Sequence, residues 1–213
     1  GWNTQTLVEK ALEGAASVGA ETELVNLYSE AYKGCYECFA CKRKGNHTDG
    51  ICAIRDNMRP LLEKAHDADV IILGSPNFFG YPSAMIRAFI ERFLFPLSTY
   101  MVKDGKHVRL LGDKVIPAGM IFTMNADKEF YDRGYKETLG STTQSLQYVL
   151  GYAEEYDSFD TLQFKDYSQM DANMFDADEK MHQHETQFPI DKQKCYEMGQ
   201  RLVAKAKELN TQE

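Results

Sequence analysis

Four cysteines lie close together in the sequence in the pattern Cys-x2-Cys-x2-Cys-x10-Cys; they are Cys35, Cys38, Cys41 and Cys52. Spacings of two residues let consecutive thiolates converge on one centre, and four thiolates suit a [4Fe-4S] cluster or a tetrahedral zinc ion. Three cysteines in a row at this spacing favour the cluster, because zinc usually takes its ligands from two separated pairs. A third interpretation is a cysteine-rich loop whose thiols only pack or oxidise, and the ten-residue gap before Cys52 keeps that alternative open.

The residues around this segment fit a negatively charged thiolate centre. Lys42, Arg43 and Lys44 would offset its charge. His47 is interpreted as a solvated loop residue rather than a ligand. The fifth cysteine, Cys195, falls on the apolar face of a predicted helix and is expected in the core.

A second candidate site follows the apolar run 70–73, which is typical of a strand buried on both faces of a parallel sheet. A helix is predicted to start near Pro82. The loop between them contains Pro76, Asn77, Phe78, Phe79 and Gly80. In open α/β sheets ligands bind at the carboxyl ends of the strands, so we expect the chemistry here. The loop holds no Ser/His/Asp set and no obvious base, so no catalytic side chain is assigned; its backbone groups and aromatic edges suit a flat ring. The alternative is an ordinary connecting loop.

The chain opens on a third candidate site, because Asn3 and Thr4 stand at the start of a predicted helix. Free N–H groups and small polar side chains at the positive end of a helix favour an anion. The alternative is that Asn3 or Thr4 only caps the helix.

The elements that must position these residues alternate between helix and strand along the whole chain. Strands are expected at 22–27, 70–73, 115–124 and 157–164, and helices up to Gly19, from Asp56, from Pro82, at 135–150 and at 191–209. The segments 95–114 and 165–189 are expected to be a long connection and a polar surface segment. This alternation predicts a single α/β domain over residues 1–213, with a doubly wound parallel sheet and a cysteine-rich loop at 34–52.

A sheet of this kind needs a strand before its first helix. We therefore expect a five-stranded sheet whose first, central strand precedes Gly1 and is absent from the chain shown.

Composition limits the function classes. The chain has 213 residues and a formal net charge of −8, with no basic patch, which argues against nonspecific nucleic-acid binding. No apolar run approaches the roughly 18 residues of a membrane span. An odd number of cysteines, clustered in a chain of this size, indicates a reducing, cytoplasmic setting rather than a secreted disulfide framework.

With these segments in place, the chain resembles the flavodoxin-like NAD(P)H-dependent FMN reductases, and most of all the branch that includes the iron–sulfur flavoproteins. The segment 1–4 is similar to the end of that family's phosphate loop, and 75–80 to the loop that holds the isoalloxazine ring. Thr123, Met124 and Asn125 occupy the place of the third loop, along the other side of the flavin. The segment 34–58 is similar to the cysteine segment, although its spacing before Cys52 is longer than is typical of iron–sulfur members.

The resemblance implies an FMN-dependent oxidoreductase that takes electrons from NAD(P)H, a transient donor, and passes them to a small acceptor such as a quinone or a flavin. An alternative is an electron carrier with FMN and a [4Fe-4S] cluster that does not use NAD(P)H directly. A weaker alternative is a non-catalytic redox sensor. The resemblance also implies a homodimer or homotetramer, for which 95–114 and 165–189 are the candidate interface segments.

Overall fold

A computed structural model describes residues 2–45 and 48–210 of the chain, so Gly1 and His47 lie outside the description. Its centre is a sheet in the strand order β2-β1-β5-β6, in which β1, β5 and β6 are mutually parallel. The strands are β1 (Ile71–Phe78), β2 (Tyr81–Pro82), β5 (Ala118–Thr123) and β6 (Ala153–Ser158). The α/β class with a mainly parallel sheet is therefore confirmed.

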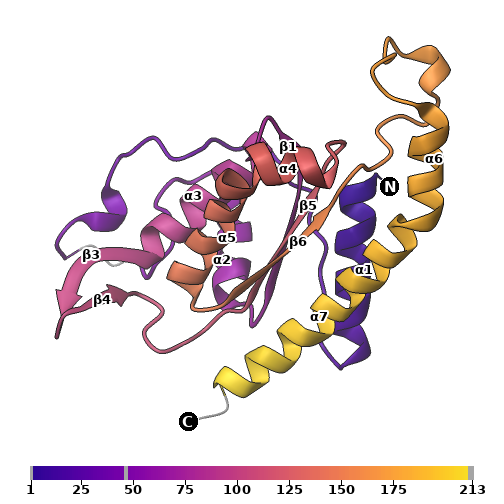
Figure 1. Cartoon of the computed structure of the whole chain (residues 1–213). Coiled ribbons are helices and arrows are strands. Elements are labelled where there is room, and N and C mark those ends of the chain that lie inside the picture. Colours follow the sequence, from indigo (N-terminus) through magenta and orange to yellow (C-terminus); the bar gives the residue numbers. More distant parts are fainter. Residues whose placement is uncertain (1, 46–47, 211–213) are drawn as a thin grey trace.

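Helices cover both faces of this sheet, as Figure 1 shows. One face carries α1 (Asn3–Ser17) and α7 (Phe188–Asn210), which pack against each other. The other face carries α2 (Met58–Asp67), α3 (Ala84–Leu97) and α5 (Lys136–Leu150). The sheet is thus doubly wound, as its sequence pattern predicts. No helix within the described ranges is long and apolar enough to span a bilayer.

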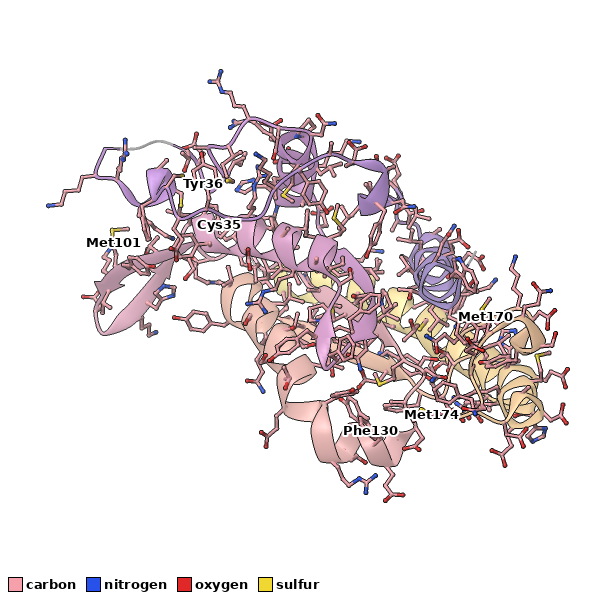
Figure 2. The ribbon with its side chains drawn as sticks, turned by 90° about the horizontal axis from the view of Figure 1, so that it is seen from above. Cys35, Tyr36, Met101, Phe130, Met170 and Met174 are labelled. Atoms are coloured by element: carbon pink, nitrogen blue, oxygen red, sulfur yellow. The ribbon has the colours of Figure 1, made fainter. Side chains whose placement is uncertain are left out.

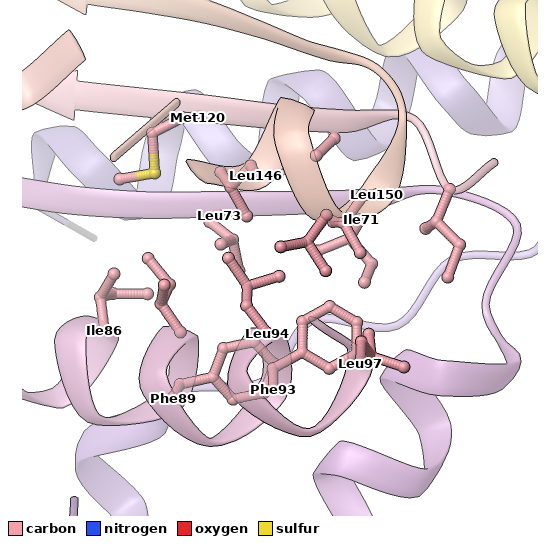
Figure 3. Close-up of a cluster of buried hydrophobic side chains, with 14 of the residues drawn as sticks. Ile71, Leu73, Ile86, Phe89, Phe93, Leu94, Leu97, Met120, Leu146 and Leu150 are labelled. Atoms are coloured by element: carbon pink, nitrogen blue, oxygen red, sulfur yellow. The ribbon is translucent and has the colours of Figure 1, made fainter. Parts of the chain in front are cut away.

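Alternation along the strands divides the core in two, because successive side chains point to opposite faces. Ile71 and Leu73 belong to the larger cluster, whereas Ile72 packs against the smaller one. β5 is buried along its whole length, which fits its place between two strands and two helical layers. Figure 3 shows the larger cluster, in which α3 and α5 close over β1 and β5; its labelled members are Ile71, Leu73, Ile86, Phe89, Phe93, Leu94, Leu97, Met120, Leu146 and Leu150.

The strand predicted at 22–27 does not form in the described structure. Residues 20–26 are irregular and lead into the short 3-10 helix η1 (Leu27–Ser29). A cavity of about 1350 Å³, lined among others by residues 19–28, α1 and β1, adjoins them. A strand needs a neighbouring backbone for its hydrogen bonds, and no strand of the described sheet lies beside this segment. The first strand expected from the sequence stays a prediction.

The last strand, β6, begins at Ala153, four residues before its predicted start at 157. It pairs with β5 from Ala118↔Ala153 to Thr123↔Ser158. The prediction was wrong because β6 contains three acidic residues, which are rare in buried strands. Each has a partner from another element: Arg201 contacts Glu154, Thr143 contacts Glu155, and Tyr131 contacts Asp157.

The two long connections contain regular structure that the sequence pattern did not predict. Residues 95–114 hold a hairpin of β3 (Ser98–Lys103) and β4 (Lys106–Arg109), turned at Asp104-Gly105, both with positive φ. Residues 165–189 hold η3 (Tyr167–Gln169) and α6 (Ala177–Thr186), which Asp176 caps by accepting from two backbone N–H groups. Two further short helices are η2 (Ala40–Lys42), in the cysteine loop, and α4 (Lys128–Gly134).

Candidate functional site

The positive end of α1 has no side-chain cap. Its N-cap is Trp2, which accepts only through its backbone, from the Thr6 N–H at 3.0 Å. The Asn3 amide donates to the Leu162 carbonyl at 2.7 Å, and the Thr4 and Thr123 hydroxyl oxygens are 2.6 Å apart. The interpretation in which Asn3 or Thr4 serves only as a cap is therefore wrong. Both side chains instead fasten the helix to the sheet's carboxyl edge and leave its first N–H groups available to an anion.

The loop after β1 is a tight hairpin with β2. Phe78 pairs with Tyr81, and the two turn residues Phe79 and Gly80 have φ of +55° and +86°, the signature of a type I′ turn. The Asn77 side chain accepts from the Gly80 N–H at 2.8 Å. This N–H, expected from the sequence to be available to a ring, is thus used inside the turn.

Phe79 sits in a conformation that costs an L-residue roughly 1 kcal/mol, while its side chain is 88 % exposed. We predict that Phe79→Asn raises the free energy of unfolding by about 1 kcal/mol, because Asn tolerates positive φ at the first position of this turn. Urea unfolding without added flavin measures it. Phe78→Asn, at the half-exposed residue just before the turn pair, is the control and should give no gain. A Phe79→Asn variant no more stable than the parent would contradict the strain argument.

The third predicted loop, at 123–125, follows β5 and contacts the segment at the end of β1. The Asn77 amide donates to the Met124 sulfur at 3.9 Å, and Thr123 and Met124 are both buried. The buried Lys180 ammonium of α6 donates to the Asn125 carbonyl at 2.9 Å, which fixes the loop. The side-chain oxygen Oδ1 of Asn125 is buried without a hydrogen-bond partner. A buried acceptor of this kind favours a ligand that donates a hydrogen bond.

These segments meet in one place. The large cavity is lined at this end by Asn3, Thr4, Pro76, Asn77, Phe78, Thr123, Met124 and Asn125. Phe79 and Gly80, expected with them, are not among its lining residues. Residues 161–163 do line it and were missed, because the predicted strand ran through them. β6 in fact ends at Ser158, so the rule that ligands bind at the carboxyl ends of parallel strands would have placed residues 161–163 at the site.

The charge of this end suits an anionic group. Lys165 places its ammonium 5.8 Å from the centre of the Trp2 ring, beside the start of α1. An uncapped helix N-terminus, a nearby cation, a buried acceptor and apolar walls together suit a phosphate joined to a flat, hydrogen-bonding ring.

The four clustered cysteines line a second, small cavity together with Phe39, Ala53, Ile54, Glu91, Arg92, Phe95 and Pro96. Cys52 is buried, and the other three are half-buried. All are free thiols, and burial raises the pKa of Cys41. Within the described ranges, no three ligating side chains are arranged closely enough to hold a metal ion.

Asp56, predicted to start the next helix, does so by accepting from the Met58 N–H at 3.2 Å.

A half-buried carboxyl pair on β6 is a feature that the sequence pattern did not reveal. The Tyr131 hydroxyl donates to Asp157 at 2.7 Å and lies 3.4 Å from Glu155. The second oxygen of Asp157 is buried without a partner. Burial, together with repulsion from Glu155, raises the pKa of Asp157 to about 7.

This pair predicts a pH-dependent stability. A carboxyl whose folded pKa lies above its unfolded value, near 3.9, favours folding at low pH and loses that contribution as the pH rises through about 7. Asp157→Asn should therefore stabilise the protein by roughly 2–4 kcal/mol at pH 8 and little at pH 4. Urea unfolding across pH 4–8 tests it, with exposed Asp171→Asn as control. An equal effect of Asp157→Asn at both pH values would refute it.

The fold and the first site have the arrangement typical of mononucleotide-binding α/β proteins: an uncapped helix N-terminus lies at the carboxyl edge of a parallel sheet. The family described as NADPH-dependent FMN reductase matches residues 1–122, and the chain belongs to this family. The family expected from the sequence is thus confirmed.

The branch expected from the cysteines is also supported by relatives. An iron-sulfur flavoprotein of Methanocaldococcus jannaschii is 39% identical over 90 residues, which are 42% of this chain and 44% of that protein. The matched segment therefore spans less than half the length of this curated relative.

Solved structures share the fold over nearly the whole chain. An NAD(P)H:quinone oxidoreductase from Methanothermobacter marburgensis superposes with a TM-score of 0.63 at 14% identity, covering 95% of this chain and 90% of that one. An FMN-dependent NADH-azoreductase from Bacillus anthracis, solved in complex with FMN, gives a TM-score of 0.58 at 12% identity, covering 95% and 92%. At these identities the likeness establishes the flavodoxin-like fold.

Proposed function

We propose that the chain is an FMN-dependent oxidoreductase that moves electrons from NAD(P)H to a small acceptor such as a quinone or a flavin. The observation that carries this proposal is the uncapped start of α1 beside residues 76–78 at the end of β1 and 123–125 at the end of β5, in a chain of the FMN reductase family. When bound, FMN would supply the hydride and electron chemistry. The protein then needs no acid–base pair of its own, and the described residues that line this end of the cavity include none.

Different residues of the chain would hold the phosphate and the ring of the cofactor. The first N–H groups of α1, with Lys165 nearby, would bind the phosphate. The backbone of Asn77, with the free side-chain oxygen of Asn125, would hydrogen-bond the polar edge of the ring. Apolar groups of Phe78 and Met124 would exclude water from it.

A second candidate function is favoured by the cysteine cavity: an iron–sulfur flavoprotein that carries single electrons through a [4Fe-4S] cluster. Four thiols from one loop around one cavity match the ligand chemistry of such a cluster, and the buried Nε of Arg92 in its wall has no hydrogen-bond partner. The donor set therefore fits the group in its chemistry, although these thiols are not drawn together around a single ion in the described structure; Cys35, Cys38, Cys41 and Cys52 are the proposed ligands. The cluster would supply one-electron transfer.

We also propose a homodimer or homotetramer, in which the segments 95–114 and 165–189 form contacts. The β3–β4 hairpin presents Tyr100, Met101 and Val102 to solvent, each more than half exposed. Figure 2 shows Met101 at the same end of the molecule as Cys35, with Met170 and Met174 at the other end. Light scattering of the purified chain, and of Met101→Lys with Val102→Lys, tests whether the hairpin carries an interface.

The deciding experiment is an absorption spectrum of protein purified without oxygen, with iron and sulfide assayed on the same sample. The two bands of oxidised flavin support the FMN site, and their absence after incubation with FMN would refute it. Oxidation of NADH or NADPH with an artificial acceptor then separates the reductase from the carrier, which would oxidise neither nicotinamide. Flavin with iron but no nicotinamide turnover favours the carrier.

A further inference from the structure

A fully buried arginine lies in the wall of the cysteine cavity. The Arg92 side chain, on α3, has no solvent exposure, which is rare for a charged residue unless it is paired. Its Nη1 and Nη2 atoms donate to the two carboxylate oxygens of Asp56, at 2.6 and 2.9 Å. The same atoms donate to the carbonyls of Lys33 at 3.0 Å and Ile54 at 3.2 Å.

These bonds use four of the five N–H donors of a guanidinium. The fifth, on Nε, is buried without a partner. An unsatisfied buried donor on a charged group costs more than about 1 kcal/mol, so a fold that keeps one has a reason to. The buried Cys52 lines the same cavity as this donor. Burial lowers the pKa of Arg92, while Asp56 and the neighbouring Cys52 sulfur raise it above its ordinary value.

A second cation flanks the other cysteines. The Lys42 ammonium donates to the carbonyls of Phe95 and Ser98 and lies 4.2 Å from the centre of the Phe95 ring. Burial lowers the pKa of Lys42, and the charges of Cys41 and Cys35 act in the opposite direction. Glu91 is the one acidic residue among the described residues of the cavity lining, and Arg87 pairs with it at 3.1 Å.

We propose that Arg92 is a positioning residue for the cluster: in the cluster-loaded protein its Nε–H would donate to the Cys52 sulfur, and its charge would stabilise the reduced form. This inference rests on the second proposed function. Reduction of the cluster would add one electron, which reduced flavin would supply, with no bond formed or broken. The added negative charge is spread over the thiolates, so hydrogen bonds and fixed cations beside them raise the reduction potential. Lys42 acts in the same direction through its charge.

Arg92→Lys tests the hydrogen bond, since lysine keeps the charge beside Asp56 but has no Nε–H. The readout is the reduction potential of the anaerobically reconstituted protein, titrated with dithionite and followed by electron paramagnetic resonance. We expect the reduced-to-oxidised ratio at a given potential to fall about tenfold, which is about 59 mV for one electron. Arg87→Lys, on the exposed side of the same helix, is the control and should change the ratio less than about twofold. An Arg92→Lys ratio equal to that of the control, at equal iron content, would overturn the proposal.

Asp56→Asn provides a second test if Arg92→Lys does not fold. It keeps the guanidinium but removes the negative charge that neutralises it, so the ratio should move in the opposite direction. No movement beyond that of the control would overturn the proposal. Iron content separates the two levels of the inference: a parent chain that takes up no iron and sulfide refutes the cluster itself, whereas a loaded parent with unshifted variants refutes only the role of Arg92.

Discussion

Gly199→Ala is expected to destabilise the protein by about 3 kcal/mol and to weaken FMN binding, because α1 and α7 touch there through their backbones. A Cβ at Gly199 would lie 1.8 Å from the Ala11 carbonyl oxygen and 2.9 Å from the Ala15 nitrogen. Backbone atoms inside a helix cannot move aside as a side chain can, so the two helices must separate. Gly14 makes the reciprocal contact, since its Cβ would lie 1.9 Å from the Tyr196 carbonyl oxygen.

Separation of these helices would also disturb the proposed phosphate site, because α1 carries its N–H groups at Asn3 and Thr4. Urea unfolding gives the stability and fluorescence titration gives the FMN affinity. Gly140→Ala, inside α5 with open space around its Cβ, is the matched control. It should stabilise the protein by roughly 0.5–1 kcal/mol, since alanine is the better helix former. A Gly199→Ala chain as stable as the parent would show that the helices do not pack as closely as described.

If the chain carries the proposed [4Fe-4S] cluster, Cys52→Ser is expected to reduce its iron well below the roughly four atoms per chain of the parent, because such a cluster is held by four thiolates. Cys52 is the ligand that sequence reasoning placed in most doubt, since it follows a ten-residue gap. In the fold it lines the same cavity as Cys35, Cys38 and Cys41. Iron and sulfide assays on anaerobically reconstituted protein measure the loss.

Cys195→Ser is the control for this prediction. Cys195 is fully buried in the smaller core cluster, and burial is the largest cause that raises its pKa, to about 12. Its replacement should leave the iron content unchanged. Equal iron in the Cys52→Ser and parent chains would contradict the four-cysteine centre, and one zinc per chain in the parent would replace the cluster by a zinc site.

Much of the fold was predictable because it depends on apolar periodicity. The patterns at 70–73 and 135–150 led to β1 and α5, and Cys195 was placed in the core from its helical face. Two segments of the proposed flavin site were predicted from one rule, that ligands bind at the carboxyl ends of parallel strands. β5 ends at Thr123, one residue before its predicted end, whereas β1 continues to Phe78, past its predicted end at 73; residues 76–78 and 123–125 nevertheless line the same cavity.

What the sequence determined by itself is therefore which apolar faces are buried, and through them the order of helices and strands. Only the tertiary structure decided where polar and charged side chains lie. The acidic strand β6 could not be recognised in the sequence, because its carboxylates are paired with Tyr131 and Arg201 from distant elements. Arg92 is buried because Asp56, 36 positions earlier, meets it in space. Burial of an apolar group is favourable against any apolar neighbour, whereas burial of a charge requires one particular partner, which the fold must bring to it.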